Sequence, residues 1–232
     1  MSANKHKYER LYRLAPRLYD TAYIIKNRAF NVVYIVKYRG YLFKQLDSVY
    51  KAECEVILNR IGKYRTTSTM ISPSAAVYLY SLVRELKPEI FLETGVSQGL
   101  SSLLILEAME KNGNGTLFST DISNDVGKLV PSRLYKRWRR VIDVPEIVLK
   151  KAIELIGDRH IDIFMHDSDH TYDAMINEFR AVKDIMSKNG IILSDDVEEN
   201  KAFVDFASSV GTKPKIIASY KCFGIIELGK RR

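Results

Sequence analysis

The chain has 232 residues, a length that suits one generous domain or one domain with an appendage, and its hydrophobic fraction of 46% suits a full core. Its two cysteines, Cys54 and Cys222, suggest neither a disulfide framework nor a zinc knuckle. No uncharged apolar run reaches membrane-spanning length, and the first residues lack the apolar core of a signal peptide, so we expect a cytoplasmic protein.

The net charge of +8 resides in the first 44 residues, which hold ten basic and two acidic residues together with seven tyrosines. A basic, aromatic segment suits an anionic membrane surface, a nucleic acid or an anionic substrate. The alternative is a solvated helical appendage whose tyrosines pack on the main domain. We expect residues 1–70 to form a basic, tyrosine-rich helical extension, with helices to about residue 65 and a hinge at 66–69, and residues 71–232 to form the main domain.

The main domain begins with a helix that Ser72 caps, that has Pro73 in its first turn, and that Pro88 ends. Strands and helices then alternate. Strands are predicted at residues 89–92, 116–120, 140–142, 161–166 and 190–194, and helices at residues 100–111, 131–139, 145–156, 172–188 and 201–208. The helix over 172–188 carries Met175, Phe179, Val182 and Met186 on one face. Two last strands, at 215–219 and 223–228, predict a closing hairpin.

This alternation predicts an α/β fold with a Rossmann-like, doubly wound and mostly parallel seven-stranded sheet. The C-terminal hairpin adds an antiparallel strand, and the helical extension precedes the sheet. Ligands of such sheets bind beyond the carboxyl ends of the strands. The residues that follow the predicted strands are therefore the candidates for function.

The most informative segment follows the first predicted strand and contains Gly95 and Gly99, with an apolar helix starting directly after it. Glycines let the backbone pass close to a ligand, and the first turn of a helix offers free N–H groups. Two glycines alone also fit an ordinary strand-to-helix turn. The residues at the other strand ends favour a loop that binds a nucleotide.

Acidic residues follow nearly every predicted strand: Glu93, Asp121, Asp143, Asp167, Asp195 and Asp196. Asp121 ends the second strand, where a carboxylate can accept hydrogen bonds from both hydroxyls of a ribose. A nicotinamide dinucleotide would also use such an acid, but its usual loop has three glycines in a G-x-G-x-x-G pattern, which this chain lacks. A smaller nucleoside ligand without a pyrophosphate fits better.

Taken together, these motifs resemble a class I S-adenosylmethionine-dependent methyltransferase. The closest branch contains the O-methyltransferases of macrolide sugars, which are related to catechol-type enzymes. The motifs that carry the resemblance are the glycine loop from Glu93 to Ser101, Asp121, the segment from His166 to Tyr172, and the segment from Gly190 to Asp196. The resemblance covers about residues 72–228 and does not extend to the N-terminal extension.

The resemblance implies a set of residues that bind S-adenosylmethionine. The glycine loop would pass around the methionine part, Glu93 would lie near its amino end, and Asp121 would hold the ribose. Asp143 would lie near the adenine amino group, although it fits equally well as the N-cap of the helix that begins at Pro145. The full implied set is Glu93, Gly95, Ser97, Gly99, Ser101, Ser102, Asp121, Asp143 and Asp167.

The resemblance also places Asp167, Asp195 and Asp196 where metal-dependent members hold a divalent ion. Three carboxylates from two neighbouring strand ends make an oxygen-rich site that suits Mg²⁺ or Mn²⁺ better than zinc. Without a cation these groups would repel one another, and some would take up protons. The alternative is that one acid caps a helix and the others are solvated.

His170 is the candidate general base, because it lies one helical turn beyond Asp167 and its ordinary pKa suits proton transfer near neutral pH. His170 and Asp167 are thus the predicted catalytic residues. His166 is expected to pack behind the site, and Asp169 to cap the helix that begins at Tyr172.

These residues predict an O-methyltransferase, with Mg²⁺ or Mn²⁺ assisting, that acts on a hydroxyl of a small molecule, sugar or glycolipid. The N-terminal residues 1–44 could then bring the enzyme to an anionic membrane as a peripheral protein. One alternative is an RNA methyltransferase that uses residues 1–44 as a basic arm. Another is a non-catalytic module that binds S-adenosylmethionine.

Overall fold

The computed structural model describes residues 48–62, 71–218 and 221–229. The predicted basic segment over residues 1–44 and the hinge at 66–69 lie outside these residues. The last part of the predicted helical extension is described, as helix α4 (Ser48–Ile61). Within the described ranges, no helix is both long and apolar enough to cross a membrane.

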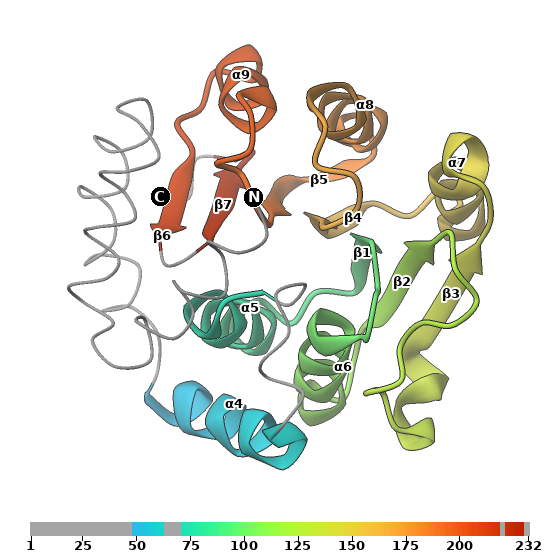
Figure 1. The fold of residues 1–232 in the computed structure, drawn as a ribbon, viewed down its shortest axis with the longest axis vertical. Helices are drawn as coiled ribbons and strands as arrows, with labels where there is room; N and C mark the ends of the chain where they lie inside the picture. Colours follow the sequence, from blue (N-terminus) through green and yellow to red (C-terminus); the bar gives the residue numbers. More distant parts are fainter. Residues whose placement is uncertain (1–47, 63–70, 219–220, 230–232) are drawn as a thin grey trace, which may run out of the picture.

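The described strands form one seven-stranded sheet in the order β3-β2-β1-β4-β5-β7-β6 (Figure 1). Their bounds are β1 (Ile90–Thr94), β2 (Thr116–Asp121), β3 (Trp138–Ile142), β4 (Ile161–His166), β5 (Met186–Ser194), β6 (Lys215–Ala218) and β7 (Cys222–Glu227). Strands β3, β2, β1, β4 and β5 pair in parallel, whereas β7 is antiparallel to β5 and to β6. The predicted Rossmann-like sheet with an antiparallel C-terminal hairpin is confirmed.

Helices cover both faces of the sheet (Figure 1). One face packs against α5 (Pro73–Leu86) and α6 (Leu100–Asn112), with α4 packed on the outside of α5, and the other packs against α7 (Pro145–Ile156), α8 (Tyr172–Lys183) and α9 (Ala202–Ser209). The alternation along a strand explains this division, because Phe91 faces the first core and Leu92 faces the second. Helix α5 begins as predicted, with the Ser72 hydroxyl accepting a hydrogen bond from the Ala75 amide at 3.2 Å.

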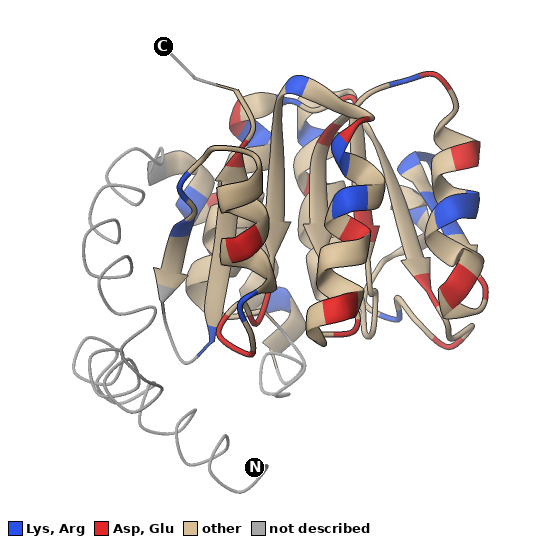
Figure 2. Cartoon of the chain, turned by 90° about the horizontal axis from the view of Figure 1, so that it is seen from above, with Lys and Arg blue, Asp and Glu red and all other residues tan. Residues whose placement is uncertain are grey.

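The strand order places a crevice at the carboxyl end of β1. The chain runs from β1 outward to β2 and β3, and then returns to add β4 on the other side of β1. The connections on the two sides therefore diverge at β1, which is the usual ligand-binding position in such sheets. Figure 2 shows acidic residues in the loops beyond the strand arrowheads at this edge.

The predicted helix at residues 131–139 is wrong in type and length. The segment forms a short 3-10 helix, η2 (Ser132–Arg137), and Trp138 already belongs to β3. The reason is a tertiary contact: the Trp138 indole is buried and donates a hydrogen bond to the Ser119 hydroxyl of β2 at 2.9 Å. The indole also lies against Gly127, where a side chain would collide with the ring.

The predicted helix at residues 172–188 ends earlier, at Lys183. Met186, which has the spacing of the buried helix face, instead begins β5 and pairs with Ile161 of β4. The Ile161 amide donates to the Ile185 carbonyl at 2.9 Å, which holds this segment in the sheet. Met186 is thus buried as a strand residue.

Helix α4 is joined to the main domain through the Glu53 carboxylate. This group accepts hydrogen bonds from the Tyr80 hydroxyl at 2.8 Å, Arg84 Nε at 3.0 Å and Lys111 Nζ at 2.7 Å. Burial alone would raise the pKa of Glu53, but the hydrogen bonds from Lys111, Tyr80 and Arg84 outweigh it and lower the pKa from 4.5 to about 2. Glu53 therefore stabilises the fold as a carboxylate.

We predict that Glu53→Gln lowers the free energy of unfolding by about 1–3 kcal/mol at neutral pH, because three donors lose a charged acceptor. Since the folded pKa lies below the unfolded one, the contribution of Glu53 is complete above about pH 4.5 and is lost as the pH falls toward 2. Chemical denaturation at pH 7, 5 and 3 measures the free energy of unfolding of the variant and of the wild type. The difference between the two should become smaller as the pH falls. The exposed Asp125–Lys128 pair supplies the control, because Asp125→Asn should change stability little. A Glu53→Gln effect that is as small as the control at pH 7 would contradict this prediction.

Candidate active site

The glycine loop between β1 and α6 is held in a conformation that requires glycine at both ends. Gly95 and Gly99 have φ values of 83° and 87°, and Ser97 between them has a φ of 49°. A Cβ at Gly95 would lie 1.9 Å from the carbonyl oxygen of Asp167, and one at Gly99 would lie 2.8 Å from the Cα of Gly127. The loop therefore packs directly on the backbone that follows β4.

Asp121 fastens this loop at the end of β2. Its carboxylate accepts hydrogen bonds from the Val96 amide at 2.9 Å, the Ser97 amide at 3.2 Å and the Ser123 amide at 2.9 Å. Part of the side chain stays exposed and lines a cavity beside the loop. Asp121 is thus placed where a polar ligand in the cavity can reach it.

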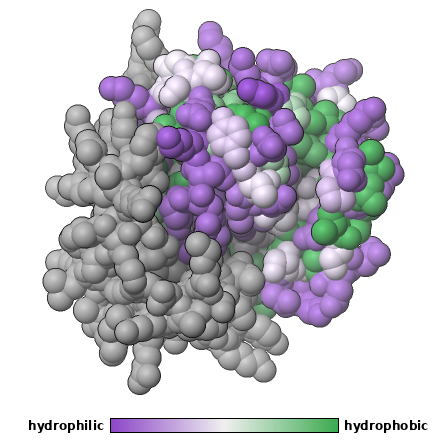
Figure 3. Space-filling model, turned by 45° about the horizontal axis from the view of Figure 1, so that its top comes forward, coloured by the Kyte–Doolittle hydropathy of each residue, from purple (hydrophilic) through white to green (hydrophobic). Residues whose placement is uncertain are grey.

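The cavity has a volume of about 1280 Å³ and opens at the carboxyl end of β1. Its polar end is formed by Gly95, Ser97, Asp121 and Asp167, and it continues between helices α7 and α8. Figure 3 shows the face that carries these helices, with apolar patches among mostly hydrophilic residues. A cavity of this size, with a polar end and apolar walls, suits a ligand of nucleoside size or larger.

Glu93 lies beneath the loop and not in the cavity wall. Its side chain is buried, and one carboxylate oxygen accepts hydrogen bonds from the Ser102 hydroxyl at 2.6 Å and the Ser119 hydroxyl at 2.9 Å. Burial raises the pKa of Glu93, against the hydrogen bonds from serines that lower it. Ser101 and Ser102 are buried with it. In the described structure these three predicted binding residues support the loop from behind.

Two acids do not take the positions that the sequence indicates. Asp143 pairs with Lys151, which lowers its pKa, and accepts a hydrogen bond from the Val144 amide; it neither lines the cavity of the described structure nor caps α7, whose N-cap is Val144. Asp169 lines the cavity but does not cap α8. The cap is Thr171, whose hydroxyl accepts from the Ala174 amide at 3.4 Å.

The predicted acid cluster does form. Asp167, Asp195 and Asp196 converge from the ends of β4 and β5, joined by a backbone hydrogen bond from the Asp195 amide to the His166 carbonyl at 3.0 Å. His170 Nε2 lies between two of these acids, 3.8 Å from Asp167 Oδ1 and 3.6 Å from Asp196 Oδ2. Asn200 donates to the His170 carbonyl at 2.8 Å and thereby fixes the backbone of this histidine.

Lys221 completes the cluster and is absent from the sequence prediction. It immediately precedes β7, is only 2% exposed, and its ammonium contacts Asp195 Oδ2 and lies 3.0 Å from Asp196 Oδ2. Burial opposes the charged form, but the neighbouring carboxylates raise the pKa of Lys221 above its ordinary value. Burial and the charge of Asp195 raise the pKa of Asp167. The cluster therefore contains its own positive charge.

A second group missed by the sequence analysis lies behind His170. The Glu178 carboxylate of α8 accepts hydrogen bonds from Thr94 at 2.6 Å and Ser168 at 2.8 Å, and lies 2.7 Å from His166 Nδ1. Burial alone would raise the pKa of Glu178, but these contacts lower it, so His166 Nδ1 donates to a carboxylate. The His166 and His170 rings pack edge to face, with their ring centroids 5.4 Å apart. His166 thus packs behind the site, as expected.

The sheet order, the glycine loop and the acids at the strand ends define the class I methyltransferase fold. Three solved structures share it. An O-methyltransferase from Bacillus cereus, in complex with S-adenosylhomocysteine, is 14% identical with a TM-score of 0.56, covering 82% of this chain and 96% of that chain. The O-methyltransferase TomG from Streptomyces achromogenes, in complex with S-adenosylmethionine, is 12% identical with a TM-score of 0.56, covering 87% and 100%. The Podospora anserina methyltransferase PaMTH1 is 16% identical with a TM-score of 0.52, covering 81% and 92%.

Residues 92–197 match the family model of a methyltransferase domain. No curated protein matches the sequence. The matched segment runs from β1 to just beyond Asp196, so that it contains the glycine loop, Asp121 and every acid of the cluster. The chain therefore has the class I methyltransferase fold, as the sequence predicts, and residues 92–197 are similar to a methyltransferase domain.

We predict that Gly95→Ala destabilises the protein more than Gly113→Ala. Both glycines have a positive φ, 83° and 76°, so both substitutions strain the backbone by roughly 1–2 kcal/mol. The Cβ at position 113 meets open space, whereas that at position 95 strikes the Asp167 carbonyl and should cost about 1–3 kcal/mol more. Thermal melting of both variants measures the difference. Equal melting temperatures would show that the loop does not pack on β4 in this way.

Proposed function

We propose that this protein transfers a methyl group from S-adenosylmethionine to a hydroxyl oxygen of a small molecule or glycan. The observation that carries the proposal is the position of Asp167. It lines the cavity together with Gly95 and Asp121, and its Oδ1 also lies 3.8 Å from His170 Nε2. Asp167 would thus lie between a methyl donor bound in the cavity and His170, the proton acceptor in the cluster.

S-adenosylmethionine would supply an electrophilic methyl group on a positively charged sulfur. The residues fit this molecule in two respects. Asp121 offers a carboxylate to ribose hydroxyls at the cavity wall, and Gly95 brings the backbone of the loop to the same wall. The solved structures of similar fold that hold S-adenosylmethionine or S-adenosylhomocysteine support the same donor.

His170 would accept the proton of the acceptor hydroxyl at Nε2. Asp167 and Asp196 flank this nitrogen at 3.8 Å and 3.6 Å, so the acids of the cluster would hold the ring in place and accept its N–H as the proton arrives. The oxygen that loses the proton forms the new bond to the methyl carbon as the bond from sulfur to that carbon breaks. The main contribution of the chain is to align the two reactants.

The divalent metal that the resemblance implies does not fit the cluster in this arrangement. Magnesium and manganese need carboxylate oxygens that are free to bind within about 2.0–2.2 Å. The Lys221 ammonium already lies against Oδ2 of both Asp195 and Asp196, and its positive charge opposes a second cation beside the same carboxylates. Among the described residues, no set of three His, Cys, Asp or Glu side chains is arranged to hold a metal ion. The proposed reaction therefore contains no metal step.

Calorimetry with S-adenosylmethionine tests the donor site. We expect the wild type to bind and Asp121→Ala to bind at least about tenfold more weakly, because the variant lacks the carboxylate that accepts hydrogen bonds from the ribose hydroxyls. Asp143→Ala is the matched control, since Asp143 also follows a strand but pairs with Lys151 away from the cavity. No binding by the wild type would refute the proposed function. Equal loss in both variants would refute the role of Asp121.

His170→Ala should lower methyl transfer about 10²–10⁴-fold while leaving the affinity for S-adenosylmethionine nearly intact. Formation of S-adenosylhomocysteine with a panel of catechols and glycosides measures the turnover. His160, which is exposed before β4, provides the control variant His160→Ala with wild-type turnover expected. Turnover in His170→Ala that equals the control would remove His170 from the mechanism.

A further inference from the structure

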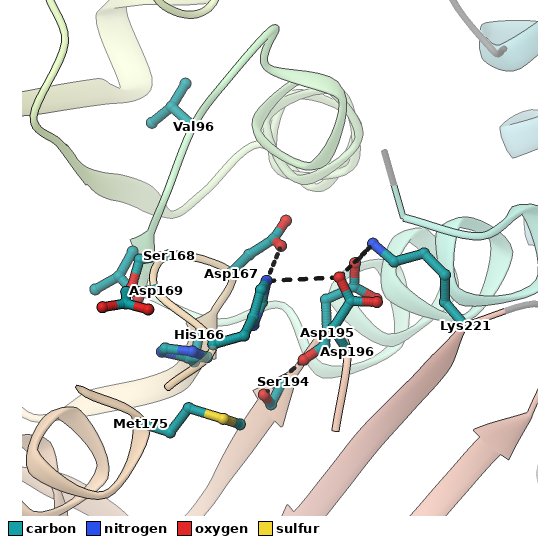
Figure 4. Close-up of polar contacts among 12 residues, drawn as sticks. Val96, His166, Asp167, Ser168, Asp169, Met175, Ser194, Asp195, Asp196 and Lys221 are labelled. Atoms are coloured by element: carbon teal, nitrogen blue, oxygen red, sulfur yellow. Dashed lines mark hydrogen bonds and ion pairs between the residues drawn. The ribbon is translucent and has the colours of Figure 1, made fainter. Parts of the chain in front are cut away.

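The backbone next to Lys221 is held in place by hydrogen bonds to the loop that follows β5. The Cys222 amide donates to Glu198 Oε2 at 2.9 Å, and the Val197 amide donates to the Cys222 carbonyl at 3.2 Å. These two bonds tie the start of β7 to the loop that carries Asp195 and Asp196. In Figure 4 the Lys221 side chain extends toward both acids from the side opposite Asp167.

The acids still have hydrogen-bonding capacity to spare. Asp195 and Asp196 are 0% and 7% exposed, and Oδ1 of each has no hydrogen-bond partner among the described residues. Buried carboxylate oxygens of this kind need a cation or a donor nearby. Lys221 supplies one positive charge to a group of three acids, and its removal would leave an oxygen-lined site with no counter-charge.

We propose that the Lys221 ammonium occupies the place of the divalent cation in this methyltransferase, so that the chain has a tethered cation where metal-dependent enzymes bind a free one. A lysine and a divalent ion exclude one another there, because both would lie against the same two carboxylates and like charges repel at short distance. The metal-binding part of this inference stands on the cluster alone. Its consequence for catalysis, turnover without added metal, rests on the proposed function.

The inference predicts that removing the ammonium creates a metal site. In Lys221→Met the apolar stem remains but the charge is lost, so the side chains of Asp195, Asp196 and Asp167 lose their counter-charge and can rearrange around Mn²⁺. After dialysis against EDTA, we expect the wild type to show no specific Mn²⁺ binding by calorimetry and electron paramagnetic resonance, and Lys221→Met to bind at least tenfold more tightly. The double variant Lys221→Met/Asp195→Asn should lose this gain.

Lys215→Met is the matched control, because Lys215 pairs with Glu227 at 2.8 Å in the same hairpin but away from the cluster. It should bind Mn²⁺ no better than the wild type. Specific Mn²⁺ binding by the wild type that Asp195→Asn abolishes would overturn the inference. So would a folded Lys221→Met variant, with a wild-type circular dichroism spectrum, that gains no affinity.

If Lys221→Met fails to fold without metal, its refolding by Mn²⁺ would support the inference, and failure to refold would leave the wild-type measurement to decide. S-adenosylmethionine calorimetry is run on the same samples. A wild type that binds neither Mn²⁺ nor S-adenosylmethionine would refute the proposed function but not the inference that Lys221 takes the place of the cation. A wild type that binds S-adenosylmethionine and loses its methyl transfer in EDTA would overturn the tethered cation but not the proposed function.

Discussion

The close contact between Gly95 and the Asp167 carbonyl joins the two halves of the site. It brings the loop after β1 onto the backbone after β4, at the position where the sheet connections diverge. Asp121 holds the same loop from the side of β2 through the Val96 and Ser97 amides. As a result, one cavity wall contains residues from three neighbouring strands, and Asp167 connects that wall to the buried acids.

The second constraint is the charge balance of those acids. Removing carboxylates from water is costly unless a cation or hydrogen-bond donors replace the solvent. In this chain the Lys221 ammonium takes the place of solvent around Asp195 and Asp196, while His170 lies between Asp196 and Asp167. The same arrangement that allows the acids to be buried also leaves His170 Nε2 3.8 Å from Asp167, which lines the cavity. Stability and the proposed chemistry therefore depend on the same residues.

Local patterns predict the parts of this structure that local interactions decide. The strand Ile161–His166 and the helix Pro145–Ile156 have the bounds that an apolar run, a proline and a glycine indicate. Trp138 and Met186 fall within predicted helices, and Met186 has helical spacing, but their contacts with Ser119 of β2 and Ile161 of β4 place both residues in strands. The acid cluster was predictable because parallel strands end at one edge. Lys221 was not, because it enters from an antiparallel hairpin whose register no short motif specifies. Glu178 likewise has the pattern of an ordinary acid on a helix.

In the proposed enzyme a nucleoside methyl donor binds beside a cluster whose cation is Lys221. A crystal structure grown with S-adenosylhomocysteine and Mn²⁺ would show both features at once. The ribose is predicted to lie at Asp121 and the sulfur toward Asp167, with the Lys221 ammonium between Asp195 and Asp196 and no manganese peak there. Manganese bound to those carboxylates, with Lys221 turned away, or a ligand bound far from Gly95, would contradict it.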